Sequence, residues 1–210
     1  MKKNVQGVYA IIDHEVESPL GPIELCRAVI MAGVRVVQLR AKKLSSLDFY
    51  ELAKQMRELC RPAGAVFIVN DRLDIALSAG ADGVHLGQDD LPLAEARKIA
   101  GEKLIIGIST HSPEEAIEAQ KGGADYIGFG AVYKTGTKTD VTAPQGPEKL
   151  REISELVKIP VIAIGGIGLS NLKQVRLSGA AGAALISGIA RTPDPGAEAA
   201  SLVREWGAPG

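Results

Sequence analysis

The stretch Ile159-Pro160-Val161-Ile162-Ala163-Ile164-Gly165-Gly166-Ile167 is an apolar run that meets two glycines near its end, and a second such run, Ala184-Leu185-Ile186-Ser187-Gly188, follows further along the chain. A strand that is buried on both faces has no polar side, so continuous apolar runs predict strands of a parallel sheet. Glycines at a strand end allow a sharp turn and bring backbone N–H groups close to a ligand. We interpret the pair as a phosphate cradle. The alternative is two tight strand-to-helix turns without a ligand.

The same alternation of apolar runs and helical spacing extends through the whole chain. In one intervening segment, for example, Phe49, Leu52, Met56 and Leu59 fall on a single helix face. Strict alternation favours parallel strands with right-handed crossovers, and eight repeats predict an α/β fold, a (β/α)8 TIM barrel, in which the cradle would follow the last two strands. A doubly wound open sheet is the alternative. The predicted strands are Gly7–Ile12, Val34–Leu39, Ala65–Val69, Gly83–Leu86, Leu104–Ile108, Tyr126–Val132, Pro160–Ile164 and Gly182–Ser187.

Length and composition are those of one compact domain. The chain has 210 residues, 46% of them hydrophobic, and a formal net charge of -1. We predict a single domain over residues 1–210 with a frayed tail at 207–210. The charge balance provides no field that would attract nucleic acid or an anionic membrane. The apolar stretch near the N-terminus is too short for a signal peptide or a membrane span, so a cytoplasmic location is expected. The sequence does not determine the oligomeric state, and a homo-oligomer is one of the possibilities.

The two cysteines and one long connection are interpreted from their local sequence pattern. Cys26 and Cys60 are unclustered and lie in segments with helical spacing, which predicts reduced thiols in the core. Residues 134–147 form a long polar connection without apolar periodicity. Such loops in compact domains usually bind ligands or close over them, so we interpret this one as a binding loop; a solvated loop is the alternative.

In a barrel, chemistry belongs at the carboxyl ends of the strands. The second predicted strand leads into Gln38, Arg40 and Lys42, which alternate along the chain and therefore share a face. Two cations and an amide on one face suit a polyphosphate, because arginine can bind it with two parallel hydrogen bonds. Surface ion pairs are an equally good explanation of these residues alone.

Acidic residues follow the third and fourth predicted strands. Asp71 comes directly after the third, and Asp89 and Asp90 come after the fourth. Two carboxylates delivered by neighbouring strand ends suit Mg²⁺, which binds one or two carboxylates together with substrate phosphates and water. Asp71 could instead cap the following helix. The pattern does not separate Asp89 from Asp90.

The fifth predicted strand leads into Ser109, a hydrogen-bond donor for a ligand. Neither His85 nor His111 is visibly paired with an acid or a nucleophile, so structural roles are favoured over general-base roles. No Ser/His/Asp, Cys/His or zinc-binding spacing stands out in the sequence.

A series of short motifs spans the chain from about Tyr9 to Ile189. Each motif is weak by itself, whereas the ordered set is specific. The motifs are Gln38-Leu39-Arg40-x-Lys42, Asn70-Asp71, His85-Leu86-Gly87-Gln88-x-Asp90, Gly107-Ile108-Ser109-x-His111, Thr135-x-Thr137-Lys138, Gly165-Gly166-Ile167 and Ile186-Ser187. In order and spacing this set resembles the thiamine phosphate synthase family. That resemblance implies a (β/α)8 barrel, in agreement with the alternation of strands and helices.

The resemblance also implies a reaction and a set of site residues. Enzymes of that family are transferases: they join 4-amino-2-methyl-5-pyrimidinylmethyl diphosphate to a thiazole phosphate with Mg²⁺, releasing pyrophosphate and forming thiamine phosphate. By matching motif, Asp71 and Asp90 would bind the metal, and Ser109, Lys138 and Arg40 would be catalytic. The pyrimidine diphosphate would be held by Gln38, Arg40, Lys42, Asn70, Ser109 and Lys138, and the thiazole phosphate by Thr135, Thr137, Gly166, Ile186 and Ser187.

One position departs from the family pattern, and three other functions remain open. The family usually has an acid between the arginine and the lysine of the first motif, where this chain has Ala41. By strand alternation Ala41 faces away from Arg40, so we expect diphosphate binding to persist without a supporting ion pair. The alternatives are a thiazole tautomerase of the same fold, a non-catalytic phosphate-binding barrel and a sugar-phosphate isomerase. Tautomerases of this kind carry a histidine just after the sixth strand, where this chain has Ala131.

Overall fold

The computed structural model describes residues 4–136 and 144–207, in which strands and helices alternate along the chain. The strands are β1 (Gly7–Asp13), β2 (Val36–Arg40), β3 (Val66–Asn70), β4 (Gly83–Leu86), β5 (Ile105–Thr110), β6 (Tyr126–Gly130), β7 (Val161–Ile164) and β8 (Gly182–Leu185). The helices are α1 (Pro22–Met31), α2 (Ser46–Cys60), α3 (Leu73–Ser78), α4 (Leu93–Ala100), α5 (Pro113–Lys121), α6 (Gly146–Leu156), α7 (Leu169–Leu177), α8 (Ser187–Ala190) and α9 (Pro195–Gly207).

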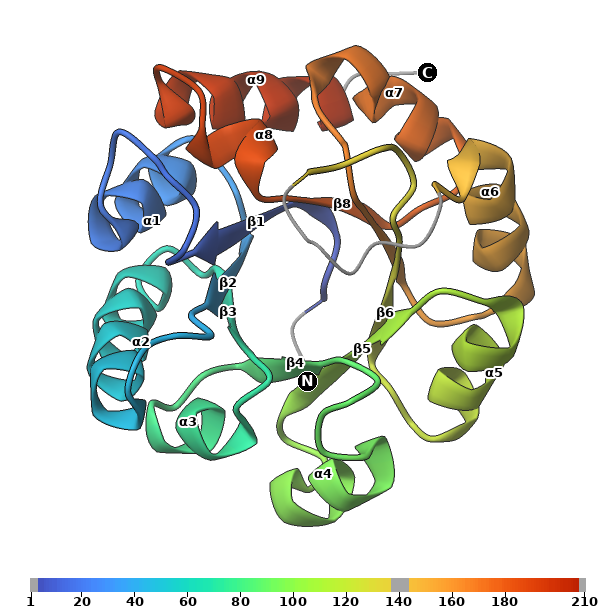
Figure 1. The fold of residues 1–210 in the computed structure, drawn as a ribbon, viewed down its shortest axis with the longest axis horizontal. Coiled ribbons are helices and arrows are strands. Elements are labelled where there is room, and N and C mark those ends of the chain that lie inside the picture. Colours follow the sequence, from blue (N-terminus) through green and yellow to red (C-terminus); the bar gives the residue numbers. More distant parts are fainter. Residues whose placement is uncertain (1–3, 137–143, 208–210) are drawn as a thin grey trace.

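The strands close into a ring. Each is parallel to the next in the order β1 to β8, and β8 pairs with β1, so that Gly7 lies opposite Gly182. Figure 1 looks down this ring, with the helices arranged around it. An open doubly wound sheet would leave two edge strands, whereas here β1 and β8 are paired on both sides. The predicted (β/α)8 barrel is therefore confirmed.

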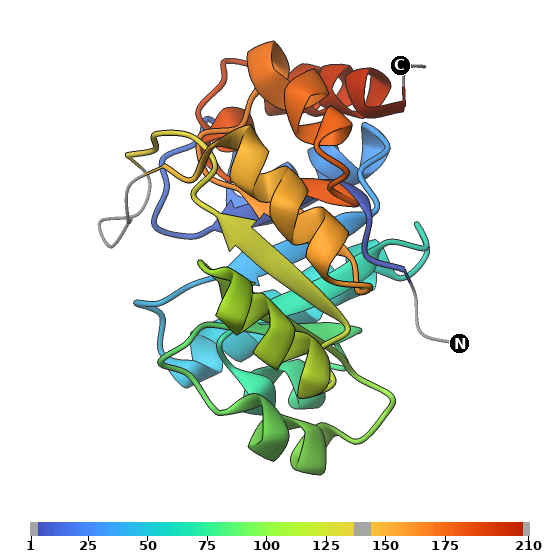
Figure 2. The same cartoon turned by 90° about the vertical axis from the view of Figure 1, so that its right-hand side faces the viewer.

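Two layers of apolar side chains hold the barrel together. Alternate residues of each strand point inward or outward. The inward layer fills the ring and includes Tyr9, Val36, Ile68, Tyr126 and Ile162. The outward layer packs against the helices, which lie side by side over the outside of the strands (Figure 2). Burial on both faces is the reason why the strands read as continuous apolar runs.

Helix starts follow the local signals of the sequence. Ser45 caps α2 by accepting a hydrogen bond from the Asp48 N–H, and Ser112 caps α5 in the same way. Pro113 occupies the first turn of α5. The predicted face of α2 is confirmed, with Phe49 and Met56 buried and Leu52 and Leu59 partly buried against the core.

Two predicted strands are too long. The prediction Tyr126–Val132 overruns β6, which ends at Gly130 because its last ladder partner, Ile164, is also the last residue of β7. The prediction Gly182–Ser187 overruns β8, which ends at Leu185, because Ser187 already begins α8. In both cases an apolar run continues past the strand into a buried turn.

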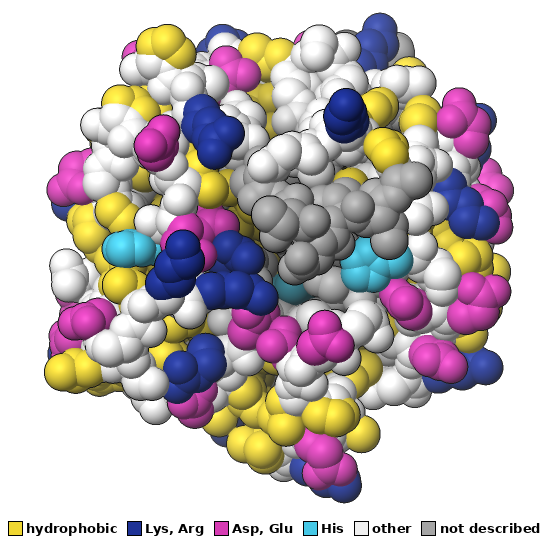
Figure 3. All heavy atoms as spheres, viewed as in Figure 1, with side chains coloured by type: hydrophobic (Ala, Val, Ile, Leu, Met, Phe, Trp, Pro, Cys, Tyr) yellow, Lys and Arg dark blue, Asp and Glu magenta, His cyan; other side chains and the backbone are white. Residues whose placement is uncertain are grey.

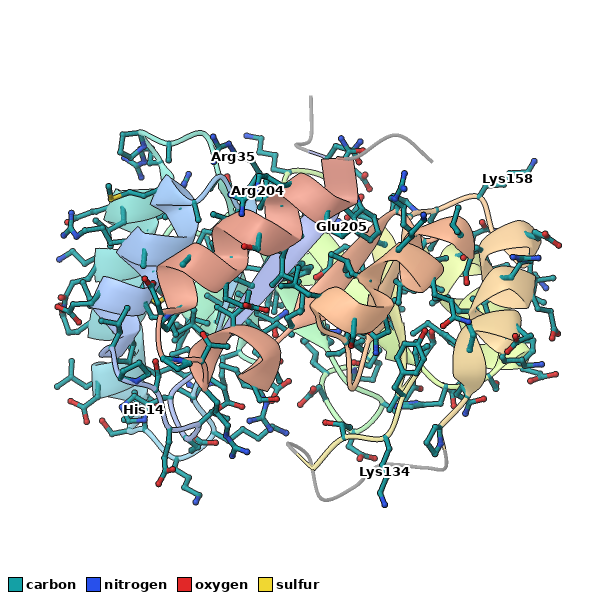
Figure 4. All side chains as sticks on the ribbon, turned by 90° about the horizontal axis from the view of Figure 1, so that it is seen from above. His14, Arg35, Lys134, Lys158, Arg204 and Glu205 are labelled. Atoms are coloured by element: carbon teal, nitrogen blue, oxygen red, sulfur yellow. The ribbon has the colours of Figure 1, made fainter. Side chains whose placement is uncertain are left out.

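The loops that follow the strands gather at one end of the barrel. Figure 4 shows His14, after β1, and Lys134, after β6, at this end, and Arg35 and Lys158, which precede strands, at the other. Cys26 and Cys60 are buried and unbridged, as predicted. Gly207 closes α9, and the rest of the predicted tail lies outside the described residues. Among the described helices, none combines the length and hydropathy needed to cross a bilayer.

Candidate active site

A cavity of about 120 Å³ opens at the carboxyl ends of the strands. Every strand contributes lining residues, so side chains that are distant in the sequence converge there. The lining contains eight of the residues predicted from the sequence: Gln38, Arg40, Asn70, Ser109, Thr135, Gly166, Ile186 and Ser187. Lys42 and Asp71 line an adjoining hollow, which shares Asn70 with the main cavity.

Arg40 is held by two acids from the segment after β1. Its Nη1 lies 2.5 Å from Asp13 Oδ2 and 3.5 Å from Glu15 Oε2. Asp13 and Arg40 are register partners at the ends of β1 and β2, and the Asp13 side chain is only 3% exposed. A buried carboxylate at this distance fixes the guanidinium through a charge-assisted hydrogen bond. Arg40 is therefore oriented before any ligand arrives.

The carboxylate of Asp71 lies between a cation and a second acid. Lys42 Nζ is 3.3 Å from Asp71 Oδ2. Burial raises the pKa of the Asp71 carboxyl, and the hydrogen bond and charge of the neighbouring Asp90 raise it further, while Lys42 acts in the opposite direction. Two carboxylates in contact repel each other when both are ionised, and a divalent cation would remove that repulsion.

The turn after β4 distinguishes Asp89 from Asp90, which the sequence pattern could not do. Asp90 Oδ2 accepts a hydrogen bond from the Gly87 N–H at 2.6 Å, which folds the turn back and brings Asp90 to Asp71. Asp89 is exposed on the outside of the same turn. The structure thus brings to Asp71 the acid that the motif resemblance selects, while metal binding by the two stays a prediction. Among residues 4–136 and 144–207 no three His, Cys, Asp or Glu side chains form a metal-binding group.

Asp71 does not cap the helix that follows it. The cap position of α3 belongs to Arg72, so the alternative reading of Asp71 is wrong. Asp71 instead adopts a left-handed backbone conformation with φ of 63°. Aspartate and asparagine tolerate this region better than most residues, because their short polar side chains bond locally. The conformation ends β3 abruptly and directs the carboxylate toward Asp90.

The opposite side of the cavity is built from backbone. Gly165 and Gly166 follow β7 with φ of 99° and 64°. A Cβ at Gly166 would lie 2.5 Å from the Lys134 carbonyl oxygen, so glycine is required there. Ser187 and Gly188 begin α8, where N–H groups precede the first helical hydrogen bond. Both turns line the cavity, as a phosphate cradle would.

Ser109 and His85 form a pair that the sequence did not reveal. His85 Nε2 lies 3.0 Å from Ser109 Oγ, and His85 Nδ1 lies 2.9 Å from the Tyr126 hydroxyl. The sequence did not reveal these partners, but hydrogen bonds at both ring nitrogens agree with the structural role that it favoured for His85. The pair lacks the third member of a hydrolytic triad, because a phenol takes the place of the carboxylate that would stabilise an imidazolium. His111, in contrast, lies 3.3 Å from Glu115, outside this pair.

Ala41 faces away from the cavity, as predicted. It is 4% exposed and belongs to the outward core layer, beside the hollow of about 200 Å³ that Asn70 and Arg72 also line. The ion pair expected to be missing is replaced in part by Asp13 and Glu15, which approach Arg40 from the neighbouring strand end.

Several predicted residues lie outside the described part of the chain. Thr137 and Lys138 are among them, and so is half of the predicted binding loop at 134–147, namely residues 137–143. Thr135 lies at the cavity, and Gly146 begins α6, so the connection ends two residues earlier than predicted.

Sequence reasoning missed Asp13, Tyr9 and Tyr126 as residues of the site. Asp13 had a usable signal, because it ends the first strand as Arg40 ends the second. The tyrosines had none, because an aromatic residue in an apolar run is typical of a core. Figure 3 shows the resulting face, on which basic and acidic side chains adjoin each other over the ends of β2 to β4.

The fold and the site are typical of a class, the (β/α)8-barrel enzymes of phosphorylated substrates, with glycine- and serine-containing turns after β7 and β8 and a charged cluster opposite. Comparison with known proteins gives the family. The profile described as thiamine monophosphate synthase matches residues 8–189, and the chain belongs to that family.

Individual relatives agree over nearly the whole length. A thiamine-phosphate synthase from Methanospirillum hungatei is 48% identical over 188 residues, which cover 90% of this chain and 91% of the relative. One from Chlorobium phaeovibrioides is 48% identical over 189 residues, covering 90% of each. The solved structure of a thiamine phosphate pyrophosphorylase from Pyrococcus furiosus superposes with a TM-score of 0.87 at 39% identity, covering 95% of each chain.

Proposed function

We propose that this protein is a cytoplasmic transferase that joins an aminopyrimidinylmethyl diphosphate to a thiazole phosphate, with release of pyrophosphate and formation of thiamine phosphate. The observation that carries the proposal is the pairing of two different anion sites around one cavity, a charged one at β2 to β4 and a backbone one at β7 and β8. Both substrates are phosphorylated, and each site suits one of them. Membership of the family supports the same conclusion.

The charged side binds the diphosphate and assists its departure. Arg40, held by Asp13, offers a pre-oriented guanidinium, while Lys42 adds a mobile ammonium that is 55% exposed. Negative charge grows on the pyrophosphate as its bond to the methylene carbon breaks, and fixed cations stabilise that charge. Asn70, Ser109 and Gln38 hold the pyrimidine end. Lys138, from the loop after β6, completes the set in this proposal.

Mg²⁺ fits Asp71 and Asp90. The two carboxylates are in contact, and burial together with the neighbouring Asp90 raises the pKa of Asp71, so a bound cation would stabilise its ionised form. Two carboxylates with substrate phosphates and water are a common magnesium environment. A magnesium ion bound there would supply positive charge beside the leaving group. The two acids hold the cation, and Lys42 stays within reach of the same phosphates.

The cradle side binds and orients the acceptor. Gly166, Ser187 and Ile186 hold the phosphate of the thiazole together with Thr135, and the motif resemblance assigns Thr137 to the same substrate. An anchored phosphate places the thiazole nitrogen near the methylene carbon, and this positioning is itself a large part of catalysis. Loss of pyrophosphate leaves a pyrimidinylmethyl cation, which the electron-rich ring stabilises. The thiazole nitrogen then captures the cation, while the enclosed cavity keeps water from competing.

The thiazole tautomerase alternative is disfavoured by residue 131. Ala131 lines the cavity directly after β6 and is buried, so the histidine of such tautomerases has no counterpart there. The chain also has the acids Asp71 and Asp90, which those relatives tend to lose. A phosphate-binding barrel without catalysis would not need a charged cluster opposite its cradle. A sugar-phosphate isomerase would need an acid and a base that both face one substrate, and the proposed residues do not include such a pair.

The test is to mix both substrates with the purified protein, with and without Mg²⁺, and to measure pyrophosphate and thiamine phosphate. We expect both products in equal amounts and only with the metal. Binding of the thiazole phosphate without any release of pyrophosphate would favour the non-catalytic alternative. Isomerised thiazole without coupling would favour the tautomerase.

A further inference from the structure

A chain of buried hydrogen bonds crosses the floor of the cavity. Gln38 Nε2 donates to the Tyr9 hydroxyl at 2.7 Å, and the two tyrosine hydroxyls lie 3.0 Å apart. Tyr126 is joined to His85 Nδ1, and His85 Nε2 to Ser109 Oγ. Gln38, Tyr9 and Tyr126 are at most 2% exposed, so the chain is shielded from water over most of its length. Its two ends, Gln38 and Ser109, both line the cavity.

The chain is held in place by glycines of two strands. A Cβ at Gly107 of β5 would overlap the Tyr126 ring, and one at Gly128 of β6 would lie 3.2 Å from His85 Cε1. The rings of His85 and Tyr126 have centroids 5.4 Å apart, and those of Tyr9 and Tyr126 are 6.2 Å apart. Small residues therefore make room for a row of three rings, which leaves each ring little freedom to turn.

The contacts beyond Tyr9 allow either direction of donation, and the Gln38 donor at the start favours one of them. Because Tyr9 accepts from Gln38, its own hydrogen is available for Tyr126, and the hydrogen of Tyr126 is then available for His85 Nδ1. A neutral imidazole that accepts at Nδ1 carries its proton on Nε2, which donates to Ser109 Oγ. The Ser109 hydroxyl keeps its hydrogen for a ligand. At the other end, the Gln38 amide has its nitrogen on Tyr9, which leaves its oxygen as the atom that accepts from a ligand.

We propose that Tyr9, Tyr126 and His85 are positioning residues which fix the cavity as an acceptor at Gln38 and a donor at Ser109, and so select an amino-substituted pyrimidine over its oxo counterpart. This inference rests on the proposed function. An aminopyrimidine offers an N–H₂ donor next to a ring-nitrogen acceptor, which matches the two ends. The oxo form offers the reverse pattern, a carbonyl acceptor next to a ring N–H donor. A reversed chain would prefer that form.

The first test reads the direction of the chain without any substrate. Nitrogen-15 NMR of the histidine side chains, at roughly pH 8 where imidazole is ordinarily neutral, distinguishes the protonated nitrogen of each ring. The His14→Gln and His111→Gln variants assign the remaining signal to His85. We expect the proton on Nε2. A proton on Nδ1, or on both nitrogens, would overturn the proposed direction.

The second test measures selectivity. The ratio of kcat/KM for the aminopyrimidine diphosphate to that for its 4-oxo analogue is compared in the wild type, Tyr9→Phe and Tyr126→Phe. The inherent reactivities of the two diphosphates cancel from the change in this ratio. Without Tyr9 the Gln38 amide can rotate, so we expect the ratio to fall about 10- to 100-fold. Tyr50→Phe, the same deletion on α2 and remote from the cavity, should leave the ratio unchanged.

The outcomes separate the two proposals. If the wild type forms no thiamine phosphate, the proposed function fails, and the NMR measurement still decides the direction of the chain. If the wild type is active but folded Tyr9→Phe and Tyr126→Phe keep its selectivity, the positioning role is refuted and the proposed function stands. A lower kcat with the selectivity ratio unchanged would indicate a merely structural role and would also refute it.

Discussion

In the proposed function, the two sides of the cavity bind anions by different means. At the ends of β2 to β4 the binding groups are ionised side chains, Arg40 and Lys42 with Asp71 and Asp90. At the ends of β7 and β8 they are backbone turns at Gly166 and Ser187. Side chains concentrate full charges, whereas backbone N–H groups provide a fixed geometry with partial charge. The difference matches the two tasks, since a leaving group needs charge and an acceptor needs only to be held.

The largest effect is expected when charge is removed from the cluster at the ends of β2 to β4. Asp71→Asn should lower kcat about 10²- to 10³-fold, the usual loss for one preorganised electrostatic group. Asparagine keeps the left-handed backbone of this position, so the fold is preserved. Steady-state release of pyrophosphate measures the effect. Asp89→Asn, the exposed neighbour in sequence of Asp90, is the matched control and should retain full activity. Unchanged turnover in Asp71→Asn would contradict the metal assignment.

On the second side, Gly166→Ala should act on binding of the acceptor. The added Cβ meets the Lys134 carbonyl oxygen and the Tyr133 side chain, and the φ of 64° is strained for alanine. We expect KM for the thiazole phosphate to rise at least about 10-fold, the value of one charge-assisted hydrogen bond, with a smaller change for the diphosphate. Gly168→Ala, where a Cβ meets nothing within 4 Å, is the control. An equal rise for both substrates would argue against separate sites.

A substitution at Asp13 tests whether Arg40 depends on the acids that hold its guanidinium in place. Asp13→Asn removes the carboxylate that lies 2.5 Å from Arg40 while keeping its shape. We expect kcat to fall about 10-fold, because a buried charge then loses its partner. Glu15→Gln, at 3.5 Å and with a more exposed carboxylate, should cost less. If Glu15→Gln were the more damaging of the two variants, the proposed order of support would be wrong.

Stability should respond to Asp71 in the opposite sense from activity. Burial and Asp90 raise the pKa of Asp71 in the folded protein, so at neutral pH its ionised form costs folding free energy. Stability is therefore lost as the pH rises from the unfolded pKa through the folded one. In chelator, Asp71→Asn should raise the free energy of unfolding by about 0.5–1 kcal/mol, which thermal denaturation measures. A lower Tm would show that Lys42 outweighs Asp90.

Local patterns predicted the barrel and the cradle. The run ending at Gly165-Gly166 is a strand and a turn by its own composition, and its role depends on few distant residues. Strand alternation also separated Ala41 from Arg40. The residues that hold the charged side chains in place were not predicted where the contact joins two different strands. Asp13 meets Arg40 only because β1 and β2 are in register, and Asp90 is distinguished from Asp89 only by the bond to Gly87.

The hydrogen-bonded chain through Tyr9, Tyr126 and His85 shows why the rest of the site could not be predicted from the sequence. Tyr9, His85 and Tyr126 look like core residues within apolar runs, and nothing in their spacing links them. Their role depends on inward orientation from β1, β4 and β6, and on Gly107 and Gly128 between them. A hydrogen-bond direction is a property of the whole set and has no local signature.

Closure of the ring has a consequence for how the chain could be rewired. Since β1 pairs with β8, and a Cβ added at Gly7 would lie 3.9 Å from the Trp206 ring, the two ends of the described chain are neighbours. The exposed turn at Gly101, between α4 and β5, lies at the end of the barrel away from the cavity. A short linker across the old ends and a cut at this turn would keep every strand pair. A ring has no obligatory first strand, so such a circular permutant would place its new termini far from both anion sites.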